Sequence, residues 1–125
     1  MIWAGLDRLG QFQLPVLITE FDHNTKNEEQ QARDLRRFYR ACFAHPAVHG
    51  LYMWGFWEGR HWRPACALWR KDFTPKPNGE AYMKLLREDF MTAGEAAPDA
   101  QGQVRFRGFP GTYRVSVGER SVTVV

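Results

Sequence analysis

The chain has 125 residues, of which 44% are hydrophobic and 25% charged, with a formal net charge of +3. A chain of this length and composition forms about one globular domain with its own core. The arginines are spread along the sequence and form no single basic block, which does not favour a nucleic-acid partner. No apolar run approaches the roughly 20 residues that span a bilayer, so no membrane partner is expected.

The first elements of the chain are a short helix and a strand. Leu6 and Leu9 stand at helical spacing and Gly10 follows as a stop signal, which predicts the last turns of a helix. The apolar run Val16–Ile18 is typical of a strand buried on both faces, as in a parallel sheet covered by helices.

Two carboxylates follow at the end of this strand. Residues two apart on a regular strand project to the same side, so Glu20 and Asp22 are expected to share one side. Ligands of α/β sheets bind at the carboxyl ends of the strands, which favours a functional role for the pair. The alternative leaves Glu20 as a solvated charge and Asp22 as a turn residue that hydrogen-bonds its own backbone.

A helix and a second strand are predicted next. Asn27 is a good helix N-cap, with Gln30 three residues later in a capping-box arrangement. Pro46 ends this helix. Its apolar residues recur at helical spacing, and they are Leu35, Phe38, Tyr39, Cys42 and Phe43. Residues 48–54 are predicted to form the next buried strand, which the helical crossover places parallel to the first.

The remaining chain divides into three stretches. A long connection occupies residues 55–77, and its aromatic content favours a functional loop over a disordered one. A final helix is capped by Pro77 and Asn78, with an apolar side formed by Tyr82, Leu85, Leu86 and Phe90. Residues 1–92 are predicted to be one unit, and residues 93–125 a linker and a small antiparallel β segment with strands near 104–109, 112–117 and 121–125.

Two tryptophans are candidates for sugar binding. Trp54 ends the second strand and Trp62 follows eight residues later, so neighbouring strands would bring both rings near the carboxylates. The C–H groups of a sugar ring pack well on an aromatic face. The alternative is that both tryptophans pack in the protein core, where most tryptophans lie.

Metal and disulfide chemistry are not indicated. His45 and His49 are four residues apart, but Pro46 ends the helix between them, so no shared helical face and no metal site are expected. Cys42 and Cys66 form no C-x-x-C pair, and two buried free thiols are favoured over a single disulfide.

The order and spacing of these motifs resemble family 10 glycoside hydrolases, the endo-1,4-β-xylanases. The matching segments are Ile18-Thr19-Glu20-Phe21-Asp22, Met53-Trp54-Gly55-Phe56-Trp57, His61-Trp62-Arg63-Pro64 and residues 71–82. The family is a (β/α)8 TIM barrel that cleaves β-1,4-linked xylan with retention. The resemblance therefore implies an α/β fold that is the C-terminal part of such a barrel, strands 7 and 8 with their helices, followed by the antiparallel β segment.

The resemblance also implies roles for individual residues. Glu20 matches the nucleophile, and Asp22 matches the acid that supports the hydrogen-bonding network of the nucleophile. Trp54 and Trp62 match the pair that encloses the sugar beside the bond cleaved. Arg63 matches a basic residue next to the second tryptophan.

The general acid/base of the family has no counterpart in this sequence. That residue is a Glu in an Asn-Glu pair at a strand end, whereas Asn27-Glu28 begins a helix. A retaining glycosidase needs two carboxyl groups about 5–5.5 Å apart, and a complete barrel needs about 250 residues. We therefore expect a fragment of a secreted xylanase that carries the nucleophile, needs no cofactor and is inactive alone. The alternative is a non-catalytic carbohydrate-binding protein with an aromatic platform of Trp54, Trp57 and Trp62.

Overall fold

The computed structural model describes residues 2–125, and their contacts divide them into two compact units between Leu86 and Arg87. The first unit holds α1 (Ile2–Gly10), β1 (Val16–Phe21), α2 (Glu28–Ala44), β2 (Val48–Met53), the 3₁₀ turn η1 (Pro64–Cys66) and α3 (Pro77–Lys84). The π-helix η2 (Leu85–Asp89) continues α3, and the second unit holds β3 (Tyr113–Val117) and β4 (Arg120–Val124). Among residues 2–125, no helix has the length and apolar character required to span a bilayer. The division into domains after residue 92 stays a prediction.

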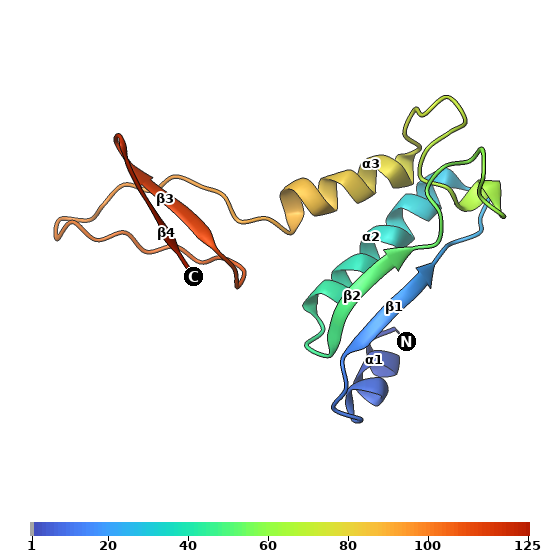
Figure 1. The fold of residues 1–125 in the computed structure, drawn as a ribbon, viewed down its shortest axis with the longest axis horizontal. Coiled ribbons are helices and arrows are strands. Elements are labelled where there is room, and N and C mark those ends of the chain that lie inside the picture. Colours follow the sequence, from blue (N-terminus) through green and yellow to red (C-terminus); the bar gives the residue numbers. More distant parts are fainter. Residues whose placement is uncertain (1) are drawn as a thin grey trace. The chain divides into compact units, whose positions relative to one another are not determined.

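β1 and β2 form the sheet of the first unit and run parallel, as the strand–helix–strand pattern predicts. Figure 1 shows the two strands side by side, with α2 along one face. Phe21 stacks on Phe38 of α2 with ring centroids 4.3 Å apart, which ties the end of β1 to that helix. The carboxyl ends of both strands therefore lie at one edge of the sheet, beside the loops that follow them.

α2 begins and ends at the residues that its caps predict. Asn27 Oδ1 accepts a hydrogen bond from the Gln30 amide at 2.9 Å and so satisfies one free N–H group of the first turn. The reciprocal bond of a capping box is not made, because the Gln30 side chain donates to Asp34 instead. His45 is the C-cap and Pro46 follows it.

The core of the first unit lies around α2, α3 and the loop between β2 and α3. Its fully buried side chains include Leu35 of α2, Leu68 of the loop and Leu85 after α3. Burial of each such side chain contributes about 1.5–3 kcal/mol to stability. Cys42 and Cys66 are buried free thiols, which confirms that prediction.

Four expectations about burial are wrong. The second strand is not buried, since Tyr52 of β2 is 58% exposed. The run Val16–Ile18 is not buried on both faces, since Leu17 is 53% exposed. The helix α2 covers only one face of the sheet, so a side chain on the opposite face stays open to solvent. Phe43 is 46% exposed in the last turn of α2. Leu86 is 42% exposed because it lies in the π-helix, whose wider turn moves residues off the predicted α-helical face.

The N-cap of α3 lies one residue before the predicted cap, so Pro77 and Asn78 are already part of the helix. Lys76 is the N-cap, and Pro77 occupies the first turn, where its missing N–H needs no partner. Asn78, expected to cap the helix, is buried within it and donates from Nδ2 to the Ala67 carbonyl at 3.2 Å. Asn78 therefore ties α3 to the preceding loop.

The second unit contains a two-stranded antiparallel hairpin, where three strands were expected. β3 pairs with β4 around Gly118, whose φ of +58° suits glycine in the turn. Residues 104–109 are not a strand. Two side chains hold this segment instead: Thr92 Oγ1 accepts from the Phe109 amide at 3.0 Å, and the Tyr113 hydroxyl donates to the Phe109 carbonyl.

Candidate functional site

Three of the predicted site residues, Glu20, Asp22 and Trp54, lie where β1 and β2 end. The backbone amide of Trp54 donates to the Phe21 carbonyl at 2.9 Å, directly after the pairing of Phe21 with Met53. Glu20 and Asp22 flank Phe21, so this bond brings the segment that carries both carboxylates next to Trp54. The Glu20 side chain is exposed, and Trp54 is 44% exposed. These three residues therefore lie at the carboxyl edge of the sheet.

The end of β1 is irregular at the candidate nucleophile. Between Ile18 and Phe21, β1 advances three residues while β2 advances two, as in a β-bulge. Thr19 and Glu20 are exposed in succession, so the regular alternation expected of this strand is interrupted at Glu20. Bulges are common next to active sites because they redirect a side chain. The sequence contains no signal for this one.

Asp22 is more buried than Glu20. Its Oδ2 atom is buried and has no hydrogen-bond partner among residues 2–125. The pKa of the Cys66 thiol is raised mainly by burial and secondly by the charge of Asp22. Asp22 therefore lies close to η1. Buried polar atoms without partners are rare in folded proteins, and functional sites are one place where they occur.

Gln31 of α2 joins the two loops that follow β1 and β2. It is 1% exposed, and its Nε2 atom donates to the His23 carbonyl at 2.6 Å and to the Ala65 carbonyl at 2.8 Å. Lys76 Nζ, also buried, donates to the same Ala65 oxygen at 2.8 Å. These bonds fix η1 beside the residues that follow Asp22. The sequence gives no signal for this role, because a polar helix residue is expected on the solvated face.

Trp62 and Arg63 form a cation–π pair on the loop surface. The Arg63 guanidinium carbon lies 4.0 Å from the Trp62 ring centroid, and Trp62 is 62% exposed. The Arg63 amide donates to His61 Nδ1 at 2.9 Å. His61 is buried against Gly55, whose φ of +78° and contact with the imidazole both require glycine. This contact links the chain directly after Trp54 to the chain directly before Trp62.

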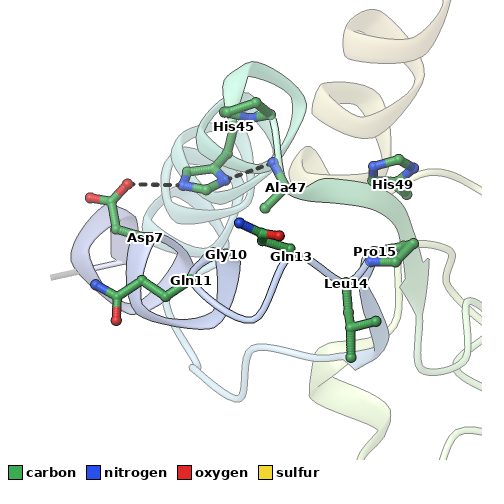
Figure 2. A pocket seen from close by; sticks show the side chains of 10 residues that line it. Asp7, Gly10, Gln11, Gln13, Leu14, Pro15, His45, Ala47 and His49 are labelled. Atoms are coloured by element: carbon green, nitrogen blue, oxygen red, sulfur yellow. Dashed lines mark hydrogen bonds and ion pairs between the residues drawn. The ribbon is translucent and has the colours of Figure 1, made fainter.

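A cavity of about 620 Å³ lies at the opposite end of the sheet (Figure 2). Its lining includes residues that precede the two strands, among them Leu14, Pro15 and Ala47. His45 is buried beside it, 3.2 Å from Asp7, and its Nδ1 atom accepts from the Ala47 amide at 3.2 Å. These bonds join α1 to the end of α2, so this His–Asp pair is structural. No predicted site residue lines the cavity.

The site offers an exposed carboxylate and an exposed indole at the same edge of the sheet. Within residues 2–125, no group of three or more His, Cys, Asp and Glu side chains is arranged to hold a metal ion. A carboxylate such as that of Glu20 can attack the anomeric carbon of a sugar or accept hydrogen bonds from its hydroxyl groups. An indole face such as that of Trp54 packs on sugar C–H groups. The chemistry of this edge therefore suits a saccharide.

A parallel strand–helix–strand unit with its site at the carboxyl edge is the repeating element of α/β barrels and open α/β sheets. The sequence model of glycosyl hydrolase family 10 matches residues 1–87, and the chain belongs to this family. The solved structure of xylanase 10B from Thermotoga petrophila RKU-1 in complex with xylobiose has a similar fold, with a TM-score of 0.60 and 24% identity. The match covers 70% of this chain and 31% of that chain.

Two curated relatives extend the comparison. The anti-sigma-I factor RsgI6 of Acetivibrio thermocellus is 41% identical over 113 residues, which are 90% of this chain and 15% of the relative. Endo-1,4-beta-xylanase 1 of Arabidopsis thaliana is 32% identical over 117 residues, which are 94% of this chain and 12% of that protein. The chain thus spans a small part of the length of both relatives. Both alignments also reach beyond the residues that match the family model.

Proposed function

We propose that the unit ending at Leu86 is the C-terminal part of the (β/α)8 barrel of a retaining endo-1,4-β-xylanase, with β1 and β2 as strands 7 and 8. The hydrogen bond from Trp54 to the Phe21 carbonyl carries this proposal, because it brings the two strand ends to one edge. In barrel enzymes the catalytic residues stand at the carboxyl edge of the strands. Membership of family 10 supplies the class of reaction.

In this proposal Glu20 is the nucleophile. Its carboxylate oxygen forms a bond to the anomeric carbon of a xylose unit while the bond to the leaving sugar oxygen breaks, which gives a glycosyl-enzyme intermediate. Water then attacks the same carbon and releases the carboxylate. Asp22 supports the nucleophile, while Trp54, Trp62 and Arg63 hold the sugar beside the bond cleaved.

The general acid/base comes from outside this chain. Retention needs a second carboxyl group about 5–5.5 Å from the nucleophile to protonate the leaving oxygen. The Asn-Glu pair of this sequence, Asn27-Glu28, lies at the start of α2 instead of at a strand end. The chain alone therefore binds xylan or its oligosaccharides without hydrolysing them. Because such a polymer does not cross membranes, the protein acts outside the cell.

A grafted enzyme tests the role of Glu20. Residues 2–86 replace the matching segment of the Thermotoga petrophila xylanase, whose remaining barrel supplies the acid/base. The graft should hydrolyse xylan, and Glu20→Ala should lower kcat by about 10⁴-fold or more while leaving the binding of xylo-oligosaccharides unchanged. Glu29→Ala, which removes an exposed carboxylate of α2, is the control and should leave kcat unchanged. Retained turnover in Glu20→Ala would refute the assignment.

A second candidate is a non-catalytic carbohydrate-binding protein. One relative of this chain is named an anti-sigma-I factor and not a hydrolase, which favours this candidate. Here the tryptophans hold the sugar, and Glu20 only accepts hydrogen bonds from its hydroxyl groups. This candidate predicts that the folded graft binds xylo-oligosaccharides and hydrolyses none, with or without Glu20.

A further inference from the structure

Trp57 and Phe73 form a stack of rings in the loop between β2 and α3. Their centroids are 5.0 Å apart and their planes are inclined by only 4°. Trp57 Nε1 donates to the Lys71 carbonyl at 3.1 Å, and Gly59 packs so closely on the indole that a Cβ there would collide with it. Trp57 is half-buried, whereas Phe73 is 62% exposed. The stack thus presents the free face of Phe73 to solvent.

The turn that carries Phe73 is held by several hydrogen bonds. The Phe73 amide donates to the Arg70 carbonyl and the Arg70 amide to the Thr74 carbonyl, each at 2.9 Å. Asp72 accepts from the Thr74 hydroxyl at 2.7 Å and from its amide at 3.0 Å. The Arg70 guanidinium donates two hydrogen bonds to Glu28 of α2, at 2.9 and 2.8 Å. The turn is therefore fixed at its tip and anchored at its base.

Phe73 occupies an unfavourable backbone conformation. Its φ is +65°, in the left-handed region where glycine is preferred and a bulky side chain is an outlier. An exposed apolar side chain alone is ordinary. An exposed ring that also has a strained backbone and rests on a second ring is unusual. Such backbone strain is concentrated at ligand-binding sites.

We propose that the free face of Phe73 is a further saccharide-binding platform, which stacks on a pyranose ring of β-1,4-linked xylan outside the pair Trp54 and Trp62. The inference rests on the proposed function, since it adds a subsite for the same polysaccharide. Phe73 and Trp62 lie on one loop and are each 62% exposed. Trp57, considered as a platform from the sequence, supports the Phe73 ring from behind.

Affinity electrophoresis of the 125-residue chain through gels containing soluble xylan tests the platform. Phe73→Ala and Phe73→Leu both remove the flat face and should weaken binding about 3- to 10-fold. Phe73→Trp keeps a flat face and should bind at least as well as the wild type. Phe12→Ala is the matched control, since Phe12 is 72% exposed before β1, at the other end of the strand, and its loss should change nothing.

The variants also separate this platform from the proposed site. Equal binding by the wild type and the folded Phe73→Leu variant, which keeps apolar volume against Trp57, overturns the platform. So does an equal loss in Phe12→Ala, because the effect would then be general hydrophobic adhesion. If Trp62→Ala weakens binding and the Phe73 variants do not, the platform is wrong and the proposed site stands. If xylan does not retard the wild-type chain, the platform and the proposed binding of xylan by the chain alone are both wrong, while the Glu20 graft separately decides the hydrolase function.

Discussion

Gly79 of α3 lies directly against the carbonyl oxygen of Leu68, which also accepts a hydrogen bond from the Lys76 amide at 2.9 Å. A Cβ at position 79 would collide with that oxygen, so α3 approaches the loop this closely only with glycine there. We expect Gly79→Ala to lower the free energy of unfolding by about 1–3 kcal/mol, measured by urea denaturation.

Gly5 of α1 supplies the matched control for this change. A Cβ at Gly5 meets nothing within 4 Å, so Gly5→Ala should raise the free energy of unfolding by about 0.5–1 kcal/mol through helix propensity. Both glycines are helical, and the two variants differ mainly in the space around the new methyl group. Equal stability of the two variants would show that the close contact with Leu68 is absent.

Glu28 makes the stability of the chain sensitive to acid. The hydrogen bonds from Arg70 are the main reason that the pKa of Glu28 lies below its ordinary value of 4.5. A carboxyl group with a lowered folded-state pKa adds stability above its unfolded pKa, and this contribution is lost as pH falls through the folded-state pKa. In thermal melts from pH 7 to pH 3, the melting temperature of the wild type should therefore fall more below about pH 4.5 than that of Glu28→Gln. Parallel melting curves for these two proteins would contradict the ion pair, and Glu29→Gln should follow the wild type.

Tyr39 carries a hydroxyl that is buried without a hydrogen-bond partner among the described residues. Burial also raises its pKa strongly. Tyr39→Phe keeps the edge-on ring contacts with Phe21 and Tyr82 and removes the unsatisfied hydroxyl, so the free energy of unfolding should stay equal or rise by about 1 kcal/mol. Tyr52→Phe, at a position that is 58% exposed, should change it by less than about 0.5 kcal/mol. A clear loss of stability in Tyr39→Phe would mean that the hydroxyl has a partner.

The elements around the sheet could be predicted because local residues specify them. Asn27 and Pro46 mark the two ends of α2, and the apolar runs on either side of that helix specify the parallel pair of strands. The same reasoning is wrong for residues 104–109, whose period-two pattern predicts a strand. Hydrogen bonds from side chains, and not strand pairing, hold this segment. An alternating pattern therefore predicts a strand only where a second strand is available to pair with it.

The finer features of the candidate site depend on tertiary contacts. Glu20 and Trp54 could be placed at one sheet edge from strand order alone. The β-bulge beside Glu20 depends on the register with β2, which no local pattern reports. Gln31 bridges two loops that are far apart in the sequence. Trp57 stacks on Phe73, which stands sixteen residues later in the chain, because the turn at Phe73 brings the two rings together. Such roles follow from the assembled fold and not from residue type.

Trapping of the covalent intermediate tests most directly the claim that Glu20 is the nucleophile. In the grafted enzyme, a 2-deoxy-2-fluoro xylobioside with a good leaving group should transfer its glycosyl group to the attacking carboxylate and leave it there long enough for mass spectrometry. We predict one added fluoroxylobiosyl group, located on Glu20 in the digest and absent from the Glu20→Ala graft. A label on another carboxylate, or turnover of the reagent without any label, would contradict the claim.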